Sequence, residues 1–342
     1  MKKEALFWKK GMGESISCGL CRRKCIIDNG HAGWCGTRLN QYGTLYTLTY
    51  GNIAAISVAP IEKKPMFNFF PGTLWLSLGG LGCNFRCQGC LSWDFSHCDV
   101  NKSLSSTTYM TPEMVVRKAK KNKCKGIAFT YNEPTMWFEF VIDVFKLAKE
   151  EGLSTCYVTN GYMLPEPLEM LSRYTDGFCL DVKGAFMESY ARISDIDDVN
   201  IIFANGSAAK RKYAMHVEIV TNLIPGYNSN DKEVKEIASW IFAELGKDTP
   251  WHLTRFFPYG HLKEVAPTPI SLLEGTRKTA MEEGIHYVYI SNVPGHNAIH
   301  TYCQTCKKVV IRRKDYDEIE IRLKEGRCGH CGALIFGRFQ AN

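Results

Sequence analysis

The fold of this chain is decided by residues 73–90, which read TLWLSLGGLGCNFRCQGC. Residues 73–81 are apolar and strand-like, and the loop that follows carries Cys83, Cys87 and Cys90 at C-x3-C-x2-C spacing. Thiolates at this spacing can hold three corners of a cubane [4Fe–4S] cluster on one tight loop. No fourth cysteine follows at a matching interval, so one iron keeps an open coordination position. Zinc, the alternative, normally takes four protein ligands in a structural site, and the sequence therefore predicts an iron–sulfur cluster.

The overall composition is that of a cytoplasmic enzyme. The chain has 342 residues, of which 45% are hydrophobic and 23% are charged, and this length suffices for one large α/β domain with small appendages. The sequence shows no apolar run near the ~18 residues that a membrane span requires and no charged-then-apolar leader segment. The net charge of +7 is divided among short basic runs, which fits solvated surfaces better than a nucleic-acid footprint. We therefore expect a cytoplasmic protein without a membrane or nucleic-acid partner.

Cysteine usage separates metal ligands from packing residues. Eleven of the 15 cysteines fall into tight clusters with the intervals of metal ligands, as expected in a reducing or anoxic cell. The others are dispersed and are interpreted as small buried hydrophobes, namely Cys98, Cys124, Cys156 and Cys179. The metal-ligand clusters divide the chain into three predicted domains, residues 1–60, 61–298 and 299–342.

The first part, residues 1–60, contains Cys18-x2-Cys21-x3-Cys25, followed by Cys35 among closely spaced glycines. Four sulfurs around glycine turns predict a closed metal site, which we call the N-terminal knuckle. Zinc is the favoured ion and an auxiliary iron–sulfur cluster is the alternative, because C-x2-C spacing serves both.

Two further expectations concern the same part. His31 lies inside the knuckle, but four cysteines already complete the site, so we expect a surface histidine. Residues 45–58 alternate polar and apolar side chains, with turn signals at Gly43 and Gly51. This pattern predicts a β-hairpin that supports the core.

The second part, residues 61–298, alternates apolar strands with amphipathic helices, which is the pattern of a parallel α/β sheet. Strands are expected at residues 73–81, 126–131, 154–159, 177–182, 216–222, 251–257 and 287–291. Helices are expected at residues 112–121, where Thr111 is the N-cap, and at 136–151 and 231–245. The number of units fits a full or partial (β/α) barrel, and an ordinary doubly wound sheet is the alternative.

Polar clusters stand at the carboxyl ends of four expected strands. They are Thr130-Tyr131-Asn132-Glu133-Pro134, Thr159-Asn160-Gly161, Asp181-Val182-Lys183-Gly184 and Thr254-Arg255. Each cluster alone is explained equally well by helix capping and turn chemistry. Because the reactive residues of such barrels lie at the carboxyl ends of strands, the four together predict a polar ligand site above the three-cysteine loop.

The third part, residues 299–342, holds Cys303-x2-Cys306 and Cys328-x2-Cys331, separated by a 21-residue spacer. Two such pairs flanking short strands predict a zinc ribbon or a rubredoxin-like site. Zinc is favoured over a single iron. A closed four-sulfur site has no open position, so its expected role is structural or electron-relaying.

Several motifs together resemble a known family. The three-cysteine loop followed by Tyr131-Asn132-Glu133-Pro134, Thr159-Asn160-Gly161 and Asp181-Val182-Lys183 is similar to radical SAM enzymes related to pyruvate formate-lyase activating enzyme, over residues 75–295. Nearly the whole chain resembles, more narrowly, the AmmeMemoRadiSam-system radical SAM protein. This second resemblance is carried by the N-terminal knuckle, Glu4-Ala5-Leu6-Phe7-Trp8, Pro60-Ile61-Glu62-Lys63-Lys64-Pro65, Trp251-His252-Leu253-Thr254-Arg255-Phe256 and Asn292-Val293-Pro294-Gly295.

The resemblance implies a cofactor and its contacts. The open iron would bind S-adenosylmethionine (SAM), and the reduced cluster would cleave it to methionine and a 5′-deoxyadenosyl radical that abstracts hydrogen from a substrate. The implied contacts are Asn132 and Glu133 at the cofactor amino group, Thr159, Asn160, Asp181 and Lys183 along its methionine and ribose portions, and His252 and Arg255 on the substrate side. The charges agree, because a carboxylate pairs with an ammonium group and a lysine or arginine neutralises a carboxylate. A plain salt bridge is the alternative role of Lys183.

The family also implies partners. An electron donor such as flavodoxin or ferredoxin is expected, and by analogy with the activating enzymes the substrate is a protein or peptide. Modification of a small molecule or RNA is the second hypothesis, and a non-catalytic metal-ribbon scaffold is the third. No cobalamin-type Asp-x-His-x2-Gly motif is present in the sequence, which disfavours B12-dependent methyl transfer.

The sequence departs from the family at two places. Relatives usually carry an aromatic residue just before the third cluster cysteine, where it packs on the adenine, but this chain has Gly89. We expect Phe85 or Trp93 to take over the stacking, or the adenine pocket to be looser. The usual polar pair before the tryptophan is replaced by Leu91-Ser92, which leaves the hydrogen bonding of the loop open.

Overall fold

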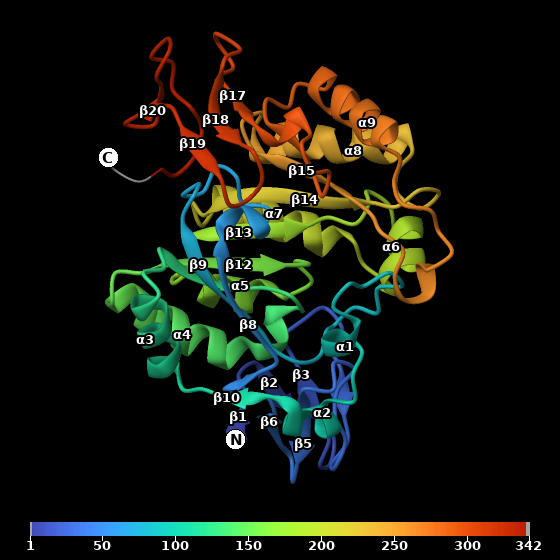
Figure 1. Ribbon diagram of the computed structural model, residues 1–342. Helices are drawn as coiled ribbons and strands as arrows, with labels where there is room; N and C mark the ends of the chain where they lie inside the picture. The colour runs from blue at the N-terminus through green and yellow to red at the C-terminus, as the bar shows by residue number, and fades with distance from the viewer. Residues whose placement is uncertain (1, 340–342) are drawn as a thin grey trace.

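The computed structural model describes residues 2–339 and is built around an eight-stranded mixed sheet (Figure 1). The strands of this sheet are β8 Ala55–Pro60, β9 Leu74–Gly79, β11 Gly126–Phe129, β12 Ser154–Thr159, β13 Gly177–Asp181, β14 His216–Leu223, β15 Trp251–Arg255 and β16 Val288–Ser291. Their order is β16-β15-β14-β13-β12-β11-β9-β8, and all neighbours are parallel except β8 and β9. Central parallel strands are buried on both faces, which explains their apolar sequences. The chain has the predicted α/β fold.

Helices connect successive parallel strands, and most of them cover one face of the sheet (Figure 1). They are α3 Pro112–Lys121, α4 Phe138–Glu150, α5 Pro165–Ser172, α6 Met187–Ser194, α7 Asn200–Arg211, α8 Asp231–Trp240 and α9 Ile270–Glu282. Helix α3 begins as predicted, because the Thr111 hydroxyl accepts a hydrogen bond from the Met114 amide at 3.3 Å and Pro112 lies in the first turn. No helix in the described part of the chain is long and apolar enough to cross a membrane.

The opposite face of the sheet, which we call the inner face, packs against residues 61–73. These residues connect β8 to β9 and begin with the short helix η1, Ile61–Lys63; we call them the closing segment. The buried residues of this contact are Ile61, Met66, Phe69, Trp75, Ala128, Cys156, Cys179 and Val220. Two of the dispersed cysteines are therefore packing residues, Cys124 is also buried, and Cys98 is partly exposed.

A buried carboxylate on β14 holds the closing segment in place. Glu218 accepts hydrogen bonds from the backbone amides of Phe67 at 2.9 Å and Asn68 at 2.8 Å, and it pairs with ring nitrogens of His216 at 2.8 Å and His252 at 2.7 Å. Burial lowers the pKa of both histidines. Burial also opposes a charge on Glu218, but the hydrogen bonds from the histidines outweigh it and lower the pKa of Glu218 to about 2. We call these five residues the floor network.

The C-terminal ribbon packs beside the closing segment, at the end of the molecule opposite the N-terminal strands (Figure 1). Its strands are β17 Thr301–Tyr302, β18 Val309–Arg313, β19 Ile319–Ile321, β20 Leu323–Lys324 and β21 Arg327–Cys328. Strands β17, β18 and β19 form an antiparallel sheet, and β20 pairs with β21.

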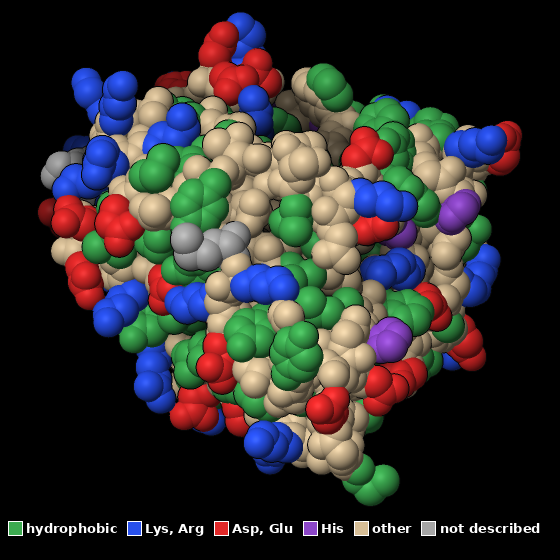
Figure 2. Space-filling model, turned by 90° about the horizontal axis from the view of Figure 1, so that it is seen from below, with side chains coloured by type: hydrophobic (Ala, Val, Ile, Leu, Met, Phe, Trp, Pro, Cys, Tyr) green, Lys and Arg blue, Asp and Glu red, His purple; other side chains and the backbone are tan. Residues whose placement is uncertain are grey.

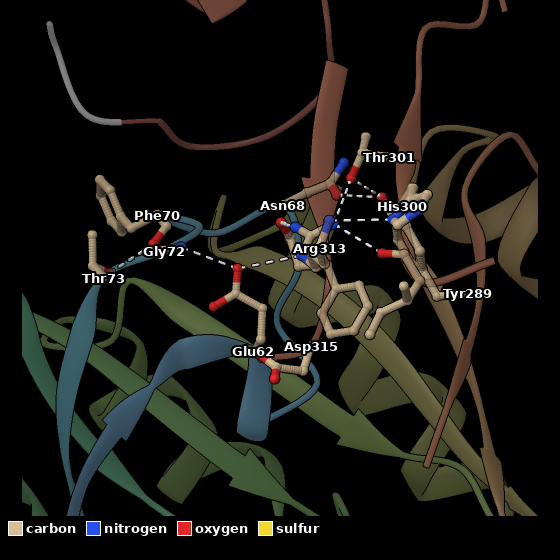
Figure 3. A network of polar contacts seen from close by, with 12 residues as sticks. Glu62, Asn68, Phe70, Gly72, Thr73, Tyr289, His300, Thr301, Arg313 and Asp315 are labelled. Carbon is tan, nitrogen blue, oxygen red and sulfur yellow. Dashed lines mark hydrogen bonds and ion pairs between the residues drawn. The ribbon is translucent and has the colours of Figure 1, made fainter. Parts of the chain in front are cut away.

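Arg313, the last residue of β18, anchors the ribbon to the rest of the molecule (Figure 3). Its buried guanidinium donates to the carbonyls of Phe67 at 2.7 Å and Ile299 at 3.1 Å and to the Thr301 hydroxyl at 2.9 Å. Its Nε lies 3.4 Å from the carboxylate of Glu62, which is also fully buried. Burial raises the pKa of Glu62 to about 7, and the nearby guanidinium acts in the opposite direction. The carboxylate of the Pro60–Pro65 motif therefore serves to attach the ribbon.

The N-terminal part consists of short strands and contains one wrong prediction. Its strands are β1 Lys3–Glu4, β2 Trp8–Lys10, β3 Ile16–Cys18, β4 Ile26–Ile27, β5 Arg38–Gln41, β6 Thr44–Thr47 and β7 Asn52–Ile53. The hairpin expected at residues 45–58 does not form, because β6 pairs with β5, β7 pairs with β10 (Thr108–Tyr109), and β8 pairs with β9. Alternation identifies a half-buried strand but not its partner, and here it marked an edge strand of the main sheet.

Charges are mixed on the surface of this end. Figure 2, which views the molecule from below, shows lysine and arginine side chains interspersed with aspartate and glutamate over that face. The dispersed charge expected from the sequence is therefore what this face presents.

Candidate active site

The three loop cysteines and the predicted polar clusters line one cavity. Cys83, Cys87 and Cys90 line it, and side chains at the ends of β11, β12 and β13 complete it. The cavity contains about 610 Å³ of atom-free space, partly open to solvent. Ser194 Oγ lies 3.5 Å from the sulfur of Cys87, and Ser96 Oγ lies 3.7 Å from that of Cys90.

The donor set fits an iron–sulfur cluster better than zinc. Burial raises the pKa of the Cys83 and Cys87 thiols, so these groups need a metal to remain thiolates at neutral pH. Within residues 2–339, the sulfurs of Cys83, Cys87 and Cys90 do not form a group whose members all lie within 4.8 Å of one another. A cubane binds each thiolate at a separate iron and therefore spreads them, whereas zinc gathers its ligands around one ion.

Asn132 fixes the backbone that leads into the cluster loop. Its side chain accepts a hydrogen bond from the Gly80 amide at 2.9 Å and donates one to the Gly82 carbonyl at 2.8 Å. The preceding residue, Tyr131, has a positive φ of 72°, which is unfavourable for a bulky side chain. Its ring lies so close to Gly79 that a Cβ there would come within 2.9 Å, so only glycine fits at that position. The structure thus shows Asn132 first as a support of the loop.

Glu133 joins the ends of β11 and β12. Its carboxylate accepts hydrogen bonds from the Thr135 amide at 3.0 Å, the Thr159 hydroxyl at 2.8 Å and the Asn160 amide at 2.8 Å, and also from the Thr135 hydroxyl. Burial raises the pKa of Glu133 and these donors counteract the rise. Donors within the protein therefore already use much of the hydrogen-bonding capacity of this carboxylate, which the resemblance assigned to the cofactor.

Asn160 connects this carboxylate to the cluster loop. Its side-chain amide donates to the Asn84 side chain at 2.8 Å, and its side-chain oxygen accepts from the Tyr162 amide at 3.0 Å. Asn84 follows the first cluster cysteine directly. A continuous set of buried hydrogen bonds thus sets the position of the loop relative to the strand ends.

Asp181 and Lys183 present charge to the cavity. Lys183 Nζ lies 2.6 Å from one carboxylate oxygen of Asp181, and the other oxygen is buried without a hydrogen-bond partner among the described residues. Burial alone would lower the pKa of Lys183. The negative charges of Asp181 and Cys87 outweigh this effect, and the pKa of Lys183 is raised. A buried oxygen without a donor is a strong candidate to bind a ligand hydroxyl or ammonium group.

Comparison with known proteins identifies the family. The Radical SAM superfamily matches residues 78–241. The chain is 38% identical to the uncharacterized protein MJ0808 of Methanocaldococcus jannaschii over 335 residues, which are 97% of this chain and 98% of that one. It is 22% identical to the pyruvate formate-lyase 1-activating enzyme of Escherichia coli (strain K12) over 203 residues, covering 59% and 81% of the two chains. This chain is a radical SAM enzyme. A solved domain of pyruvate-formate lyase-activating enzyme from Bacteroides vulgatus superposes with a TM-score of 0.43 and 18% identity, over 49% of this chain and 99% of that domain.

The structure gives a reason for Gly89 in this radical SAM enzyme. A Cβ at Gly89 would lie 3.1 Å from the ring of Phe256 and 3.2 Å from Leu262, and both of these side chains are buried. The loop that follows β15 thus occupies the space into which a side chain at position 89 would project. Of the two aromatic residues expected to replace it, Phe85 lines the cavity, whereas Trp93 stacks on a neighbouring histidine outside it.

His252 and Arg255 lie in different surroundings. His252 is fully buried in the floor network, where Phe67 and Tyr289 pack on its ring, and it does not line the cavity of the cluster loop. His252 therefore belongs to the floor network, one register row from Thr254 on the same face of β15. Arg255 lies at the carboxyl end of β15, partly exposed, and donates to the Thr268 carbonyl at 3.0 Å.

Three polar side chains form a row across the inner face. From the sequence, Thr254 was named only as part of a strand-end cluster, and the other two were not singled out. Asn222, Thr254 and Ser291 are register partners on β14, β15 and β16, near the carboxyl ends of these strands. Each has a buried side-chain oxygen with no hydrogen-bond partner among the described residues. We call them the polar row. Single polar residues at strand ends are common, so only their alignment in the sheet reveals them.

Lys64 is a further residue that sequence reasoning missed. Its side chain is almost fully buried, and burial lowers its pKa to about 8. Its ammonium group lies 5.4 Å from the ring centroid of Tyr131, which lines the cavity. It makes no ion pair within residues 2–339, so a cation with few protein contacts stands beside the cavity of the enzyme.

The C-terminal cysteines are arranged as a metal site. Their four sulfurs all lie within 4.8 Å of one another, and Cys303 is 3.6 Å from Cys331 while Cys306 is 3.7 Å from Cys328. With Zn–S bonds of about 2.3 Å, the edge of a tetrahedral site measures about 3.8 Å. The ribbon is therefore preformed for one tetrahedral ion, as the spacing predicted.

Proposed function

We propose that this enzyme cleaves SAM at the cluster held by Cys83, Cys87 and Cys90 and then abstracts hydrogen from a protein or peptide. The cavity described above supports the cleavage of SAM, because it brings three cluster thiols together with the unpartnered oxygen of Asp181 and with Lys183. Membership of the radical SAM superfamily supports the same chemistry. The cluster, once reduced, supplies the electron that breaks the sulfonium bond of SAM.

The chain's own residues hold and shield the cofactor. Asp181 would accept a hydrogen bond from a cofactor hydroxyl or ammonium group through its free oxygen, and Lys183 would neutralise the cofactor carboxylate. Thr159 and Asn160 lie at the cavity wall, where Glu133 fixes both. Because Glu133, Thr159 and Asn160 are buried, this wall of the cavity would shield the reactive carbon from water.

The substrate would lie against the polar row and near Lys64. An extended peptide offers alternating amide donors and carbonyl acceptors, which suit the unpaired oxygens of Asn222, Thr254 and Ser291. The likeness to an enzyme named as activating pyruvate formate-lyase supports a protein substrate. Modification of RNA or of a small molecule is the second hypothesis, and it is favoured by the buried cation at Lys64 beside the cavity.

Several finer assignments belong to the same proposal. We take the sheet to be a partial (β/α) barrel over residues 61–298, flanked by the knuckle of residues 1–60 and the ribbon of residues 299–342. We take the protein to be a cytoplasmic member of the AmmeMemoRadiSam-system family that receives electrons from a flavodoxin or ferredoxin. The shared motifs and the +7 net charge support these assignments.

The first test is anaerobic cofactor cleavage. The protein is reconstituted with iron and sulfide, reduced with dithionite and mixed with SAM, and 5′-deoxyadenosine is quantified. We expect cleavage by the wild type and none by Cys87→Ala, with Cys124→Ala as a control that retains activity. A reconstituted cluster that neither binds nor cleaves SAM would overturn the proposal.

The second test identifies the substrate class. An extract from cells grown in deuterated medium is separated into protein, RNA and small-molecule fractions, and deuterium in the 5′-deoxyadenosine product is measured by mass spectrometry. Transfer from a protease-sensitive fraction supports the proposal, whereas transfer from either other fraction overturns the protein hypothesis. A Thr254→Val variant should lose about tenfold of this transfer, since one hydrogen bond of about 1.4 kcal/mol changes a rate tenfold.

A further inference from the structure

The four cysteines of the N-terminal knuckle line a cavity of their own. Cys18, Cys21, Cys25 and Cys35 surround about 330 Å³ of atom-free space, partly open to solvent. The rest of the lining is largely apolar and includes Leu20, Ile27, Trp34 and Met136.

The spacing of the sulfurs separates this site from the ribbon. Within residues 2–339, the ribbon supplies the single group of three or more metal-ligating side chains whose ligand atoms all lie within 4.8 Å. Neither the knuckle nor the cluster loop meets that criterion, even for three sulfurs. The knuckle therefore shares its wide spacing with the loop that belongs to the iron–sulfur cluster of this enzyme, and not with the compact zinc-like site.

Side chains around the cavity suit an anionic cluster. Arg38 is fully buried, forms an ion pair with Glu139, and lies 4.0 Å from the sulfur of Cys18. The hydroxyl of Thr37 lies 3.2 Å from the sulfur of Cys35. A cluster with four thiolate ligands carries net negative charge, and such donors and cations around the sulfurs stabilise it and set its potential.

The knuckle and the cluster loop share a wall. Asn84, which follows the first loop cysteine, also lines the knuckle cavity, and its carbonyl accepts a hydrogen bond from Arg23 at 3.0 Å. Gly82 approaches the backbone of Cys35 so closely that a Cβ there would lie 2.6 Å from its carbonyl oxygen. Cys25 and Cys35 are partly exposed, so the outer side of the knuckle is accessible to a partner.

We propose that Cys18, Cys21, Cys25 and Cys35 hold an auxiliary [4Fe–4S] cluster through which an electron reaches the catalytic cluster. A low-potential one-electron donor, such as reduced flavodoxin, reduces the auxiliary cluster from the 2+ to the 1+ state. The auxiliary cluster returns to 2+ as the catalytic cluster passes from 2+ to 1+, and no atom is transferred. The identity of the site does not depend on SAM cleavage, whereas its role as a relay rests on the proposed function.

Acid-labile sulfide decides the identity of the site. In a Cys83→Ala, Cys87→Ala, Cys90→Ala variant reconstituted without oxygen, we expect about four iron atoms and four sulfides per chain to remain. In a Cys21→Ser variant the wild-type sulfide content of about eight should fall by half, and in a Cys124→Ala control it should stay unchanged. A ribbon occupied by zinc or by a single iron contributes no sulfide, so it does not interfere.

A triple variant that holds no acid-labile sulfide would overturn the proposal. A second zinc ion per chain that is lost in the Cys21→Ser variant would also overturn it. If the triple variant does not fold, the wild type gives the same answer by electron paramagnetic resonance. SAM should then alter one of two reduced-cluster signals, and a single signal that responds fully to SAM would contradict the inference.

The relay is tested by the choice of reductant. Reduced flavodoxin should support 5′-deoxyadenosine formation in Cys21→Ser at least tenfold more slowly than in the wild type, while a small-molecule reductant restores most of the rate. Equal rates with flavodoxin would exclude the relay. Loss of SAM cleavage in the wild type would contradict the proposed function and leave the sulfide result intact.

Discussion

The two four-cysteine modules use the same number of thiols in different geometries. In the C-terminal ribbon the sulfurs lie within 4.8 Å of one another, in a shape that fits one ion. In the N-terminal knuckle they surround an apolar cavity next to the catalytic loop. The pairs of C-x2-C spacing look alike in the sequence, so the spacing identifies ligands but not the group that they bind.

The two modules also differ in what their buried arginines do. Arg313 of the ribbon faces backbone carbonyls and Glu62, so its charge serves attachment. Arg38 of the knuckle pairs with Glu139 but also faces the sulfur of Cys18. Each module is attached by a buried Arg–Glu pair, the ribbon to the closing segment and the knuckle to helix α4, but only in the knuckle does that arginine lie beside the sulfurs.

Removing the ribbon metal should have the largest effect. A Cys303→Ser, Cys328→Ser variant should lose its metal and unfold the ribbon, since a structural zinc ion, for example, contributes an apparent ~10–16 kcal/mol in small zinc domains. Metal analysis and limited proteolysis measure this outcome. A ribbon that stays protease-resistant without metal would contradict the structural role, and Cys21→Ser should leave the metal content of the ribbon unchanged.

Breaking either arginine pair should have the next largest effect. Arg313→Met and Arg38→Met each leave a buried carboxylate unpaired, which costs about 3–5 kcal/mol in free energy of unfolding. Denaturant unfolding measures the loss, and removing Lys314 from its exposed pair with Glu318 should cost no more than about 1 kcal/mol.

The same pair of variants distinguishes the modules. Arg38→Met should also shift the reduction potential of the knuckle, whereas Arg313→Met should leave the metal content of the ribbon unchanged. If Arg38→Met leaves that potential unaltered, Arg38 acts only as an anchor and the two modules are alike in this respect.

Local sequence predicted the repeating part of the fold well. The strand Ser154–Thr159 and the helix Pro112–Lys121 lie where alternation and capping residues placed them. The hairpin at residues 45–58 was wrong because a pattern of period two does not name the partner strand.

The candidate site was predictable where its chemistry is local in sequence. The three loop cysteines were found from their spacing, Asp181 and Lys183 from their place at a strand end, and all five lie in one cavity. His252 was placed on the substrate side, but its position depends on Glu218 and on a segment far away in the chain. Of the polar row, Thr254 was noted at a strand end, but Asn222 and Ser291 were missed because the row exists only through the register of three strands.

Acid should weaken the ribbon end of the molecule more than the knuckle end. Burial lowers the pKa of His216 and His252, so the stability that their neutral forms provide is present above about pH 6.5 and is lost as the pH falls below it. The ionised form of Glu218 also stabilises the fold, and this contribution is lost at lower pH, between about pH 4.5 and pH 2, since folding lowers the pKa of Glu218 from 4.5 to about 2. The floor network should therefore loosen on acidification.

A His216→Gln variant measures this pH dependence. It keeps a neutral donor for Glu218 but removes one titrating group, so the slope of unfolding free energy between pH 7 and pH 5 should decrease by up to about 1.4 kcal/mol per pH unit. Unfolding by urea at several pH values gives the slope. The exposed His31 of the knuckle provides the matched control, and an equal change in His31→Gln would refute the assignment.

The smallest effect is expected at a cysteine outside all three metal sites. Cys124 follows α3 and is buried, and its pKa is raised by burial alone. Cys124→Ala removes one sulfur from an apolar setting, so the free energy of unfolding should fall by about 1 kcal/mol and the iron, zinc and sulfide contents should not change. Metal analysis of this variant, next to that of Cys21→Ser, shows whether the loss of metal follows the ligand geometry or only the number of thiols. Loss of metal in Cys124→Ala would mean that proximity of sulfurs in the structure is a poor guide to ligation, and the contrast between knuckle and ribbon would lose its basis.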